Sequence, residues 1–200
     1  MKDPYVATID RDRIDREMGV LRRFVTDRRW DRMQTVLDNR TRYIAVTVED
    51  IYQPHNASAV LRSCDAFGVQ DVHIVENYNR YHVNPGVELG SAQWLSLFRY
   101  ARPGTEEAIQ HLRAAGYRIV ATTPHRDDHD VESLALERGP LVLLFGAEKE
   151  GLSQTALAAA DEYVRIPMYG FVESFNISVS AAILLHRLTA RMRESGLPWR

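Results

Sequence analysis

Cysteine is nearly absent from this 200-residue chain, which has Cys64 alone. A single cysteine excludes an intrachain disulfide and a cysteine-cluster metal site. Long apolar runs are also missing, since no stretch approaches the roughly 18 apolar residues that a membrane span needs. The N-terminal residues have no apolar core like that of a signal peptide. We therefore expect a cytoplasmic protein with no membrane partner.

Lysine is the second scarcity, with only Lys2 and Lys149 in the chain. The other 23 of the 25 basic residues are arginine, whose planar guanidinium fits phosphate and stacks on bases. A GC-rich genome would also favour arginine, so the bias alone does not select an RNA partner. Residues 1–42 hold 11 basic and 8 acidic residues, a net +3 within a chain of net charge −2. This is a weak basic bias rather than a patch.

Three common ligand-binding motifs are missing as well. No strand leads into G-x-G-x-x-G, so the Rossmann dinucleotide signature is absent, and no G-x-x-x-x-G-K-[ST] marks a P-loop. There is also no G-x-S-x-G elbow of a hydrolase. An α/β enzyme without these motifs must hold its ligand in another way.

Residues 10 to about 39 are rich in charge and predict two helices. Apolar residues recur there every three or four positions, one stripe per helix: Ile14, Met18, Leu21, Val25, Met33, Val36 and Leu37. Asp27 could cap a second helix that starts near Arg28. At Tyr43 the pattern changes to YIAVTVE, a nearly continuous apolar run typical of a strand buried on both faces. We therefore place a boundary near residue 42, between a short N-terminal helical segment and a main domain of residues 43–200.

Strands and helices alternate through that main domain. After the first strand, the pattern predicts helices at 56–67, 105–115, 153–160 and 176–194, and strands at 72–76, 94–100, 117–123, 141–146 and 163–167. Strands that alternate with helices of this length indicate an α/β fold with a parallel sheet covered by helices on both faces.

Ligands of open parallel sheets bind at the carboxyl ends of the strands. Three strand ends carry suggestive chemistry: QPHN at 53–56, FGAEKEGLS at 145–153 and IPMYGFVESFN at 166–176. We expect these three segments to form the binding site.

The same segments resemble the three motifs of the SpoU/TrmH branch of the SPOUT methyltransferases. Asn56 and Arg62 in PHNASAVLRSCDAFGV match the first motif, and LVLLFGAEKEGLS matches the second. VRIPMYGFVESFNISVSAA matches the third, with all three in the family's order. The helical lead-in with Arg29, Arg32 and Arg40 is similar to the TrmH-type enzymes. One departure is that the chain ends at Arg200, without the long C-terminal extension of some TrmH members.

The resemblance implies a C-terminal trefoil knot, an obligate homodimer and S-adenosylmethionine (SAM) as the methyl donor. It implies methyl transfer to a ribose 2′-OH of RNA, most simply a D-loop guanosine of tRNA. Two alternatives stay open: methylation of ribosomal RNA, and a non-catalytic RNA-binding dimer. Because the residues of the motifs are intact, the sequence argues against the second.

The resemblance also implies roles for individual residues. The catalytic set is Arg62, Asn56, Glu148, Ser174 and Asn176. The SAM-binding set is Thr122, Gly146, Ile166, Met168 and Phe175. The RNA-binding set is Arg29, Arg32 and Arg40. A literal base role for Arg62 is physically awkward, because guanidinium holds its proton; a cation that binds phosphate and stabilises alkoxide charge needs no such shift.

Each of these residues also has a structural explanation. Arg62 could be a surface arginine paired with Asp65, Asn56 an N-cap, and Gly146 and Gly151 turn residues. Ser174 and Asn176 stand where caps are expected, and Glu148 could order its own loop. Arg29 and Arg32 could pair within their helix.

Metal chemistry is not needed for methyl transfer. His125 and His129 have a spacing that could bind a metal, but two histidines in a polar loop are usually only a loop. We therefore expect no metal.

Overall fold

The computed structural model describes residues 10–82, 84, 86, 89–124 and 129–197, and the chain divides into two compact units at residues 40 and 41. The first unit contains α1 (Arg11–Leu21), the 3₁₀ turn η1 (Arg22–Phe24) and α2 (Asp27–Asp38). Asp10 caps α1 by accepting a hydrogen bond from the backbone of Arg13, 3.1 Å away. Thr26, not Asp27, caps α2, so the prediction of an Asp27 cap is wrong. The helix begins one residue earlier than expected, because the Thr26 hydroxyl reaches the backbone of Arg29.

The second unit is a seven-stranded sheet in which every pair of neighbouring strands is parallel. Its strands are β1 (Ile44–Glu49), β2 (Asp71–Glu76), β3 (Ser96–Ala101), β4 (Arg118–Thr122), β5 (His129–Asp130), β6 (Leu141–Phe145) and β7 (Glu162–Arg165). The order across the sheet is β3-β2-β1-β6-β4-β7-β5. The predicted parallel α/β fold is confirmed.

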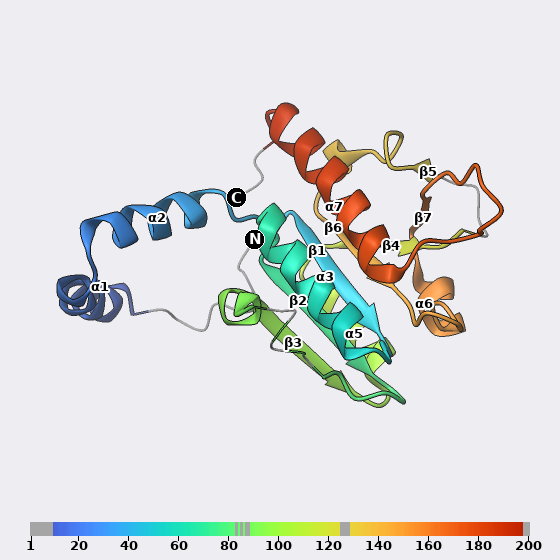
Figure 1. The fold of residues 1–200 in the computed structure, drawn as a ribbon, viewed down its shortest axis with the longest axis horizontal. Coiled ribbons are helices and arrows are strands. Elements are labelled where there is room, and N and C mark those ends of the chain that lie inside the picture. The colour runs from blue at the N-terminus through green and yellow to red at the C-terminus, as the bar shows by residue number, and fades with distance from the viewer. Residues whose placement is uncertain (1–9, 83, 85, 87–88, 125–128, 198–200) are drawn as a thin grey trace. The chain divides into compact units, whose positions relative to one another are not determined.

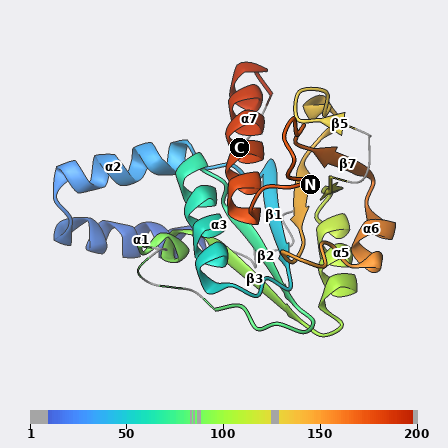
Figure 2. The ribbon, with the colours of Figure 1, turned by 45° about the vertical axis from the view of Figure 1, so that its right-hand side comes forward.

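Two layers of helices cover the sheet, one on each face (Figure 1 and Figure 2). Ile44, Val46 and Val48 of β1 join one core with α3 (Pro54–Phe67) and α7 (Ile177–Glu194). Ala45 of β1 joins a second core with α5 (Gly104–Ala114) and α6 (Gln154–Ala159). All six residues of β1 are buried, as its unbroken apolar run predicts.

Two strand details differ from the sequence pattern. The strand predicted at 94–100 begins at Ser96, because residues Ser91–Trp94 form a 3₁₀ turn (η2) after Gly90, whose φ is +84°. Strand β5 was not predicted, since two residues in a polar loop carry no apolar pattern. Neither difference moves the carboxyl edge of the central strands.

Candidate active site

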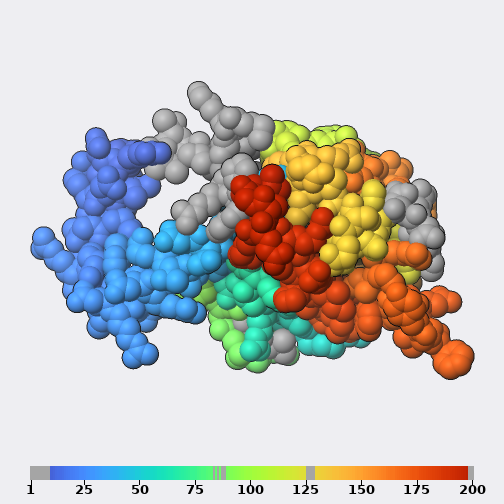
Figure 3. Space-filling view, turned by 90° about the horizontal axis from the view of Figure 1, so that it is seen from above, coloured from blue at the N-terminus to red at the C-terminus, as the bar shows by residue number. Residues whose placement is uncertain are grey.

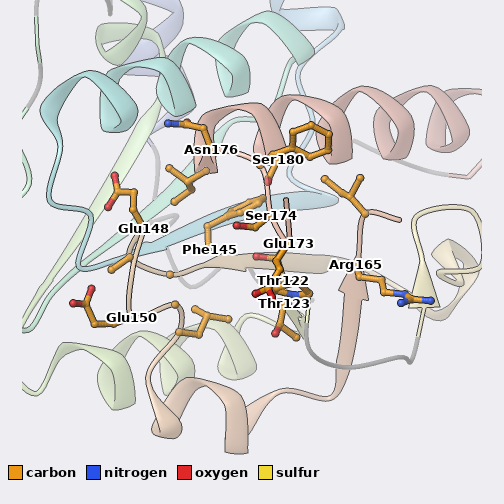
Figure 4. Close-up of a pocket in the computed structure, with 18 of the residues that line it drawn as sticks. Thr122, Thr123, Phe145, Glu148, Glu150, Arg165, Glu173, Ser174, Asn176 and Ser180 are labelled. Carbon is orange, nitrogen blue, oxygen red and sulfur yellow. The ribbon is translucent and has the colours of Figure 1, made fainter. Parts of the chain in front are cut away.

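A cavity of about 560 Å³ opens at the carboxyl edge of the sheet. The connection from β1 to α3 lines it, together with the end of β4, the loop after β6, the loop after β7 and the start of α7. In Figure 4, Glu148 and Glu150 stand at one end of the cavity and Thr122, Thr123 and Arg165 at the other. The cavity therefore lies where a parallel sheet is expected to bind its ligand.

Nine of the ten residues assigned above to catalysis or SAM binding line this one cavity: Asn56, Thr122, Gly146, Glu148, Ile166, Met168, Ser174, Phe175 and Asn176. Four further lining residues lie inside the three segments that were expected to form the site, although no individual role was assigned to them: Gln53, Phe145, Leu152 and Glu173. Arg165 and Ser180 lie outside those segments but within the third motif, and sequence reasoning did not single them out. Leu184 was missed, because it lies two turns inside the apolar helix α7.

Asn56 joins two other motif residues from inside the protein. Its amide nitrogen lies 2.7 Å from Oε1 of Glu148, and its amide oxygen accepts a hydrogen bond of 3.1 Å from Asn176. The side chain is buried, with 2% of its surface exposed. The N-cap explanation is wrong, because α3 begins at Pro54 and Gln53 occupies the cap position. Asn56 is therefore in the first turn, with its amide free to connect loops that are distant in sequence.

Asn176 combines a cap with a place in the cavity. Its side-chain oxygen accepts hydrogen bonds from the backbone and the hydroxyl of Ser178, at 2.9 and 2.7 Å, so it caps α7. Its amide nitrogen is thereby turned toward Asn56. The two explanations of this asparagine are thus compatible.

The loop after β6 has a fixed shape. A Cβ on Gly146 would lie 2.1 Å from the backbone carbon of Gly151, so no larger residue fits there without moving the chain. Ala147 and Gly151 exchange two backbone hydrogen bonds, of 3.0 and 2.9 Å, and Gly151 has φ +69°. Backbone close approach, rather than turn geometry alone, explains the glycine at 146.

The cavity has apolar walls and charged ends. Ile166 and Met168 are half-buried and Phe175 is 41% exposed, so these three side chains offer apolar surface. The Thr122 hydroxyl donates to the carbonyl of Leu144 at 2.7 Å, which fixes its direction. Three lining residues are acidic and two are basic: Glu148, Glu150, Glu173, Lys149 and Arg165. This composition suits an amphipathic ligand that carries positive charge.

Arg62 does not line the cavity of its own chain. It is exposed on α3, two turns after His55 on the same exposed stripe. The Arg62 guanidinium forms no hydrogen bond or ion pair with any residue that the structure describes, so the pairing with Asp65 offered as its structural explanation is not seen. An unpaired exposed cation is available to a ligand or partner outside the chain.

The arginines of the first unit divide into two kinds. Arg29 and Arg32 are exposed on α2 and form no ion pair within the described ranges, so intrahelical pairing does not engage them. Arg40 is buried, with 9% of its surface exposed. The third predicted RNA contact is therefore not an open cation like the other two.

Of the two histidines that could have bound a metal, His125 lies outside the described residues. His129 lies in β5, with Nε2 3.6 Å from a carboxylate oxygen of Glu162. Across the part of the chain that the structure describes, no group of three His, Cys, Asp or Glu side chains is placed to hold a metal ion. In the same part, no helix is long and apolar enough to cross a membrane.

Comparison with known proteins agrees with this geometry. Residues 43–186 match the SpoU rRNA methylase family. A tRNA (guanosine(18)-2'-O)-methyltransferase from Borreliella burgdorferi is 42% identical over 188 residues, 94% of this chain and 85% of that protein. The crystal structure of the A. aeolicus TrmH/SpoU tRNA modifying enzyme superposes with a TM-score of 0.75, at 29% identity and 85% coverage of both chains. An AdoMet-bound rRNA methyltransferase from Sinorhizobium meliloti superposes with a TM-score of 0.65, at 26% identity, over 79% of this chain and 60% of that one.

Proposed function

The chain belongs to the SpoU methylase family, and we propose that it methylates a ribose 2′-OH of tRNA, at a D-loop guanosine, in the cytoplasm. The observation that carries the proposal is the single cavity lined by Asn56, Glu148 and Asn176, which hydrogen bonds hold together across 120 residues of sequence. Methyl transfer depends on the positioning of its reactants, and a network that fixes three side chains at one cavity supports that role.

The cavity fits SAM in size and chemistry. Its volume of about 560 Å³ lies within the range of small-ligand sites. Ile166, Met168 and Phe175 offer apolar surface for adenine, and the close-packed Gly146 loop offers backbone groups. SAM, when bound, supplies an electrophilic methyl group on a cationic sulfur. The carboxylates of the cavity attract that positive charge.

The residues of the chain then have positioning roles. Ser174 and Asn176 line the cavity at the start of α7, and in this proposal they orient the ribose toward the methyl donor. Asn56 and Glu148 hold Asn176 in that place. Arg62 binds the adjacent phosphate and stabilises alkoxide charge as it develops on the 2′-oxygen, without losing its own proton.

A homodimer would bring Arg62 to the reaction. In one chain Arg62 is outside the cavity, so we propose that it serves the cavity of a second copy. The surface beside the cavity carries exposed apolar side chains, Tyr169, Phe171, Val172 and Val179, of which Tyr169 and Phe171 are almost fully exposed. The loop that holds three of them stands out from the surface of the second unit, in orange, in Figure 3. Exposed apolar surface of this kind favours association.

A knot is the topological part of the proposal. The chain leaves α6 on one face of the sheet, passes through the sheet as β7, and reaches α7 on the other face by way of residues 166–176. Residues of that connection line the same cavity as the loop after β6, and strand β6 is inserted between β1 and β4. Both features support a trefoil knot closed by α7.

Ribosomal RNA is the second candidate substrate. Sequence identity favours tRNA: the B. burgdorferi tRNA methyltransferase is 42% identical to this chain, and the S. meliloti rRNA methyltransferase is 26% identical.

Mapping of ribose methylation tests the proposal directly. RNA from cells with and without the gene is compared, and purified protein is then incubated with SAM and unmodified tRNA. We expect one 2′-O-methyl group on a D-loop guanosine that appears only with the gene. A site in ribosomal RNA would support the alternative, and SAM-independent RNA binding without methylation would indicate a non-catalytic dimer.

A further inference from the structure

A buried carboxylate outside the cavity holds the loop after β6 from behind. Glu49, the last residue of β1, has 3% of its surface exposed. Its Oε2 accepts a hydrogen bond of 2.7 Å from the backbone N–H of Ser153, and its Oε1 accepts one of 2.8 Å from the Ser153 hydroxyl. Ser153 directly follows Gly151 and Leu152, which line the cavity. Glu49 therefore fixes the point at which the cavity loop enters α6.

The same carboxylate is tied to a second strand end. Oε1 of Glu49 also accepts from the hydroxyl of Thr105, at 2.5 Å. Thr105 in turn accepts from the side-chain amide of Asn77 at 2.8 Å, and that amide also donates to Asp50 at 3.2 Å. Glu49 thus joins the carboxyl ends of β1 and β2 and the first turn of α5 to the cavity loop.

The direction of each hydrogen bond requires a group that only accepts. Both hydroxyls already accept one hydrogen bond, Thr105 from Asn77 and Ser153 from the backbone of Ala156 at 3.1 Å. Each hydroxyl donates its single proton to Oε1 of Glu49, which is the acceptor for both. Glutamine has the same shape but one donor group, so it would leave a buried hydroxyl or the Ser153 N–H facing another donor.

We propose that Glu49 is a positioning residue for methyl-donor binding, acting through Ser153 on the loop at 146–152. The proposal rests on the proposed function, because the ligand of that loop is taken to be SAM. Its hydrogen bonds act at one end of the loop, whereas Asn56 acts on Glu148 in the middle of it. A loop held at both places presents its backbone to the ligand in one geometry, without reorganising on binding.

The test compares Glu49→Gln with a matched control in the full-length protein. Glu162→Gln is the control, because Glu162 is also buried (5% exposed) but is bonded to Arg118 and Arg138, away from the loop. We expect Glu49→Gln to raise the SAM dissociation constant and the KM for SAM roughly tenfold, with kcat at saturating SAM and the KM for tRNA changed less than about twofold. The control loses thermal stability but keeps the KM for SAM.

Two results would overturn the proposal. The first is an unchanged KM for SAM in Glu49→Gln together with a loss of active protein like that of the control, because these two outcomes are what a purely structural role of Glu49 would give. The other is a KM effect that adds in full to that of Ser153→Ala, because residues that act through one contact are not additive. If Glu49→Gln does not fold, Ser153→Ala replaces it as the test variant and is expected to raise the KM for SAM by itself.

Calorimetry with SAM distinguishes failure of the proposed function from failure of this inference. No binding by wild type overturns both, whereas equal binding by wild type and variant overturns the inference alone.

Discussion

His73 on β2 is a buried histidine that no part of the proposed reaction uses. It is 1% exposed, its Nδ1 lies 2.9 Å from the hydroxyl of Tyr100, and its ring stacks on Phe98 with centroids 4.8 Å apart. Burial, with a smaller contribution from the charge of His111, lowers the pKa of His73 from 6.5 to about 4. The residue is therefore neutral in the folded protein at neutral pH.

This histidine predicts a loss of stability on acidification. Below pH 6.5 the unfolded chain binds a proton at His73 that the folded protein does not bind until about pH 4. The free energy of unfolding should therefore fall by roughly 2–3 kcal/mol between pH 7 and pH 4.5 from this residue alone, and not at all above pH 7. Urea unfolding across that range, in wild type and in His73→Phe, measures the contribution as the difference in pH dependence.

Tyr100→Phe is the matched control, because it removes the hydrogen bond to His73 but keeps the histidine. It should lose some stability at every pH and retain the acid-dependent fall. An equally steep fall in His73→Phe would assign the pH dependence to other groups.

Single residues also mark the limit of what the sequence could predict. The motif match identified Asn56, Glu148 and Asn176, yet their hydrogen bonds join residues 92 and 120 positions apart, which no local pattern encodes. Glu49 was missed, because a glutamate that ends an apolar strand is ordinarily a turn residue facing water. Only its burial and its contacts with Ser153 and Thr105 distinguish it.

At the scale of elements, patterns of period 3.6 and unbroken apolar runs predicted most of the helices and strands. They could not give the strand order, because β6 pairs with β1 and β4 although three other strands, β2, β3 and β5, also precede it in the chain. Strand β5 was missed since it is held by pairing with β7 and not by its own residues. The wrong prediction of an Asp27 cap displaced the start of α2 by one residue. It affected no contact in the cavity.

Helix α2 carries a prediction of its own. Arg29 and Arg32 are exposed, three residues apart and free of ion pairs among the described residues, so on one helix face they can bind neighbouring phosphates. Replacing both by glutamine should weaken tRNA binding and reduce the slope of log affinity against log salt by about one to two units, while SAM affinity stays unchanged. Filter binding at several salt concentrations measures the slope.

The control for this pair is a double variant in the second unit, Arg113→Gln with Arg187→Gln. Both control arginines are exposed but paired with acids, Asp161 and Glu132. Their loss should leave the salt slope unchanged. A slope that changes in the control but not in the α2 variant would move the RNA contacts from α2 to the second unit.

At the scale of the whole molecule, the cavity and Arg62 serve one proposed reaction, yet Arg62 does not line the cavity of its own chain. Asn176 lines the cavity, and Arg62 is exposed outside it. The sequence could not reveal this separation, because both residues are in motifs that follow the order of the family. The separation of Arg62 from the cavity predicts that each active site of the dimer consists of the cavity of one chain and the Arg62 of the other.

Subunit complementation tests this arrangement. Arg62→Ala and Asn176→Ala should each form inactive dimers, with a mass about twice 22.9 kDa by light scattering. When the two variants are unfolded, mixed in equal amounts and refolded, a mixed dimer joins the intact cavity of the Arg62→Ala chain to the intact Arg62 of the Asn176→Ala chain. Half the dimers are then mixed, with one working site of two, so about a quarter of wild-type activity should return. If Arg62 served its own chain, every site in the mixture would lack one residue and no activity would return; a monomer by light scattering would exclude the arrangement from the outset.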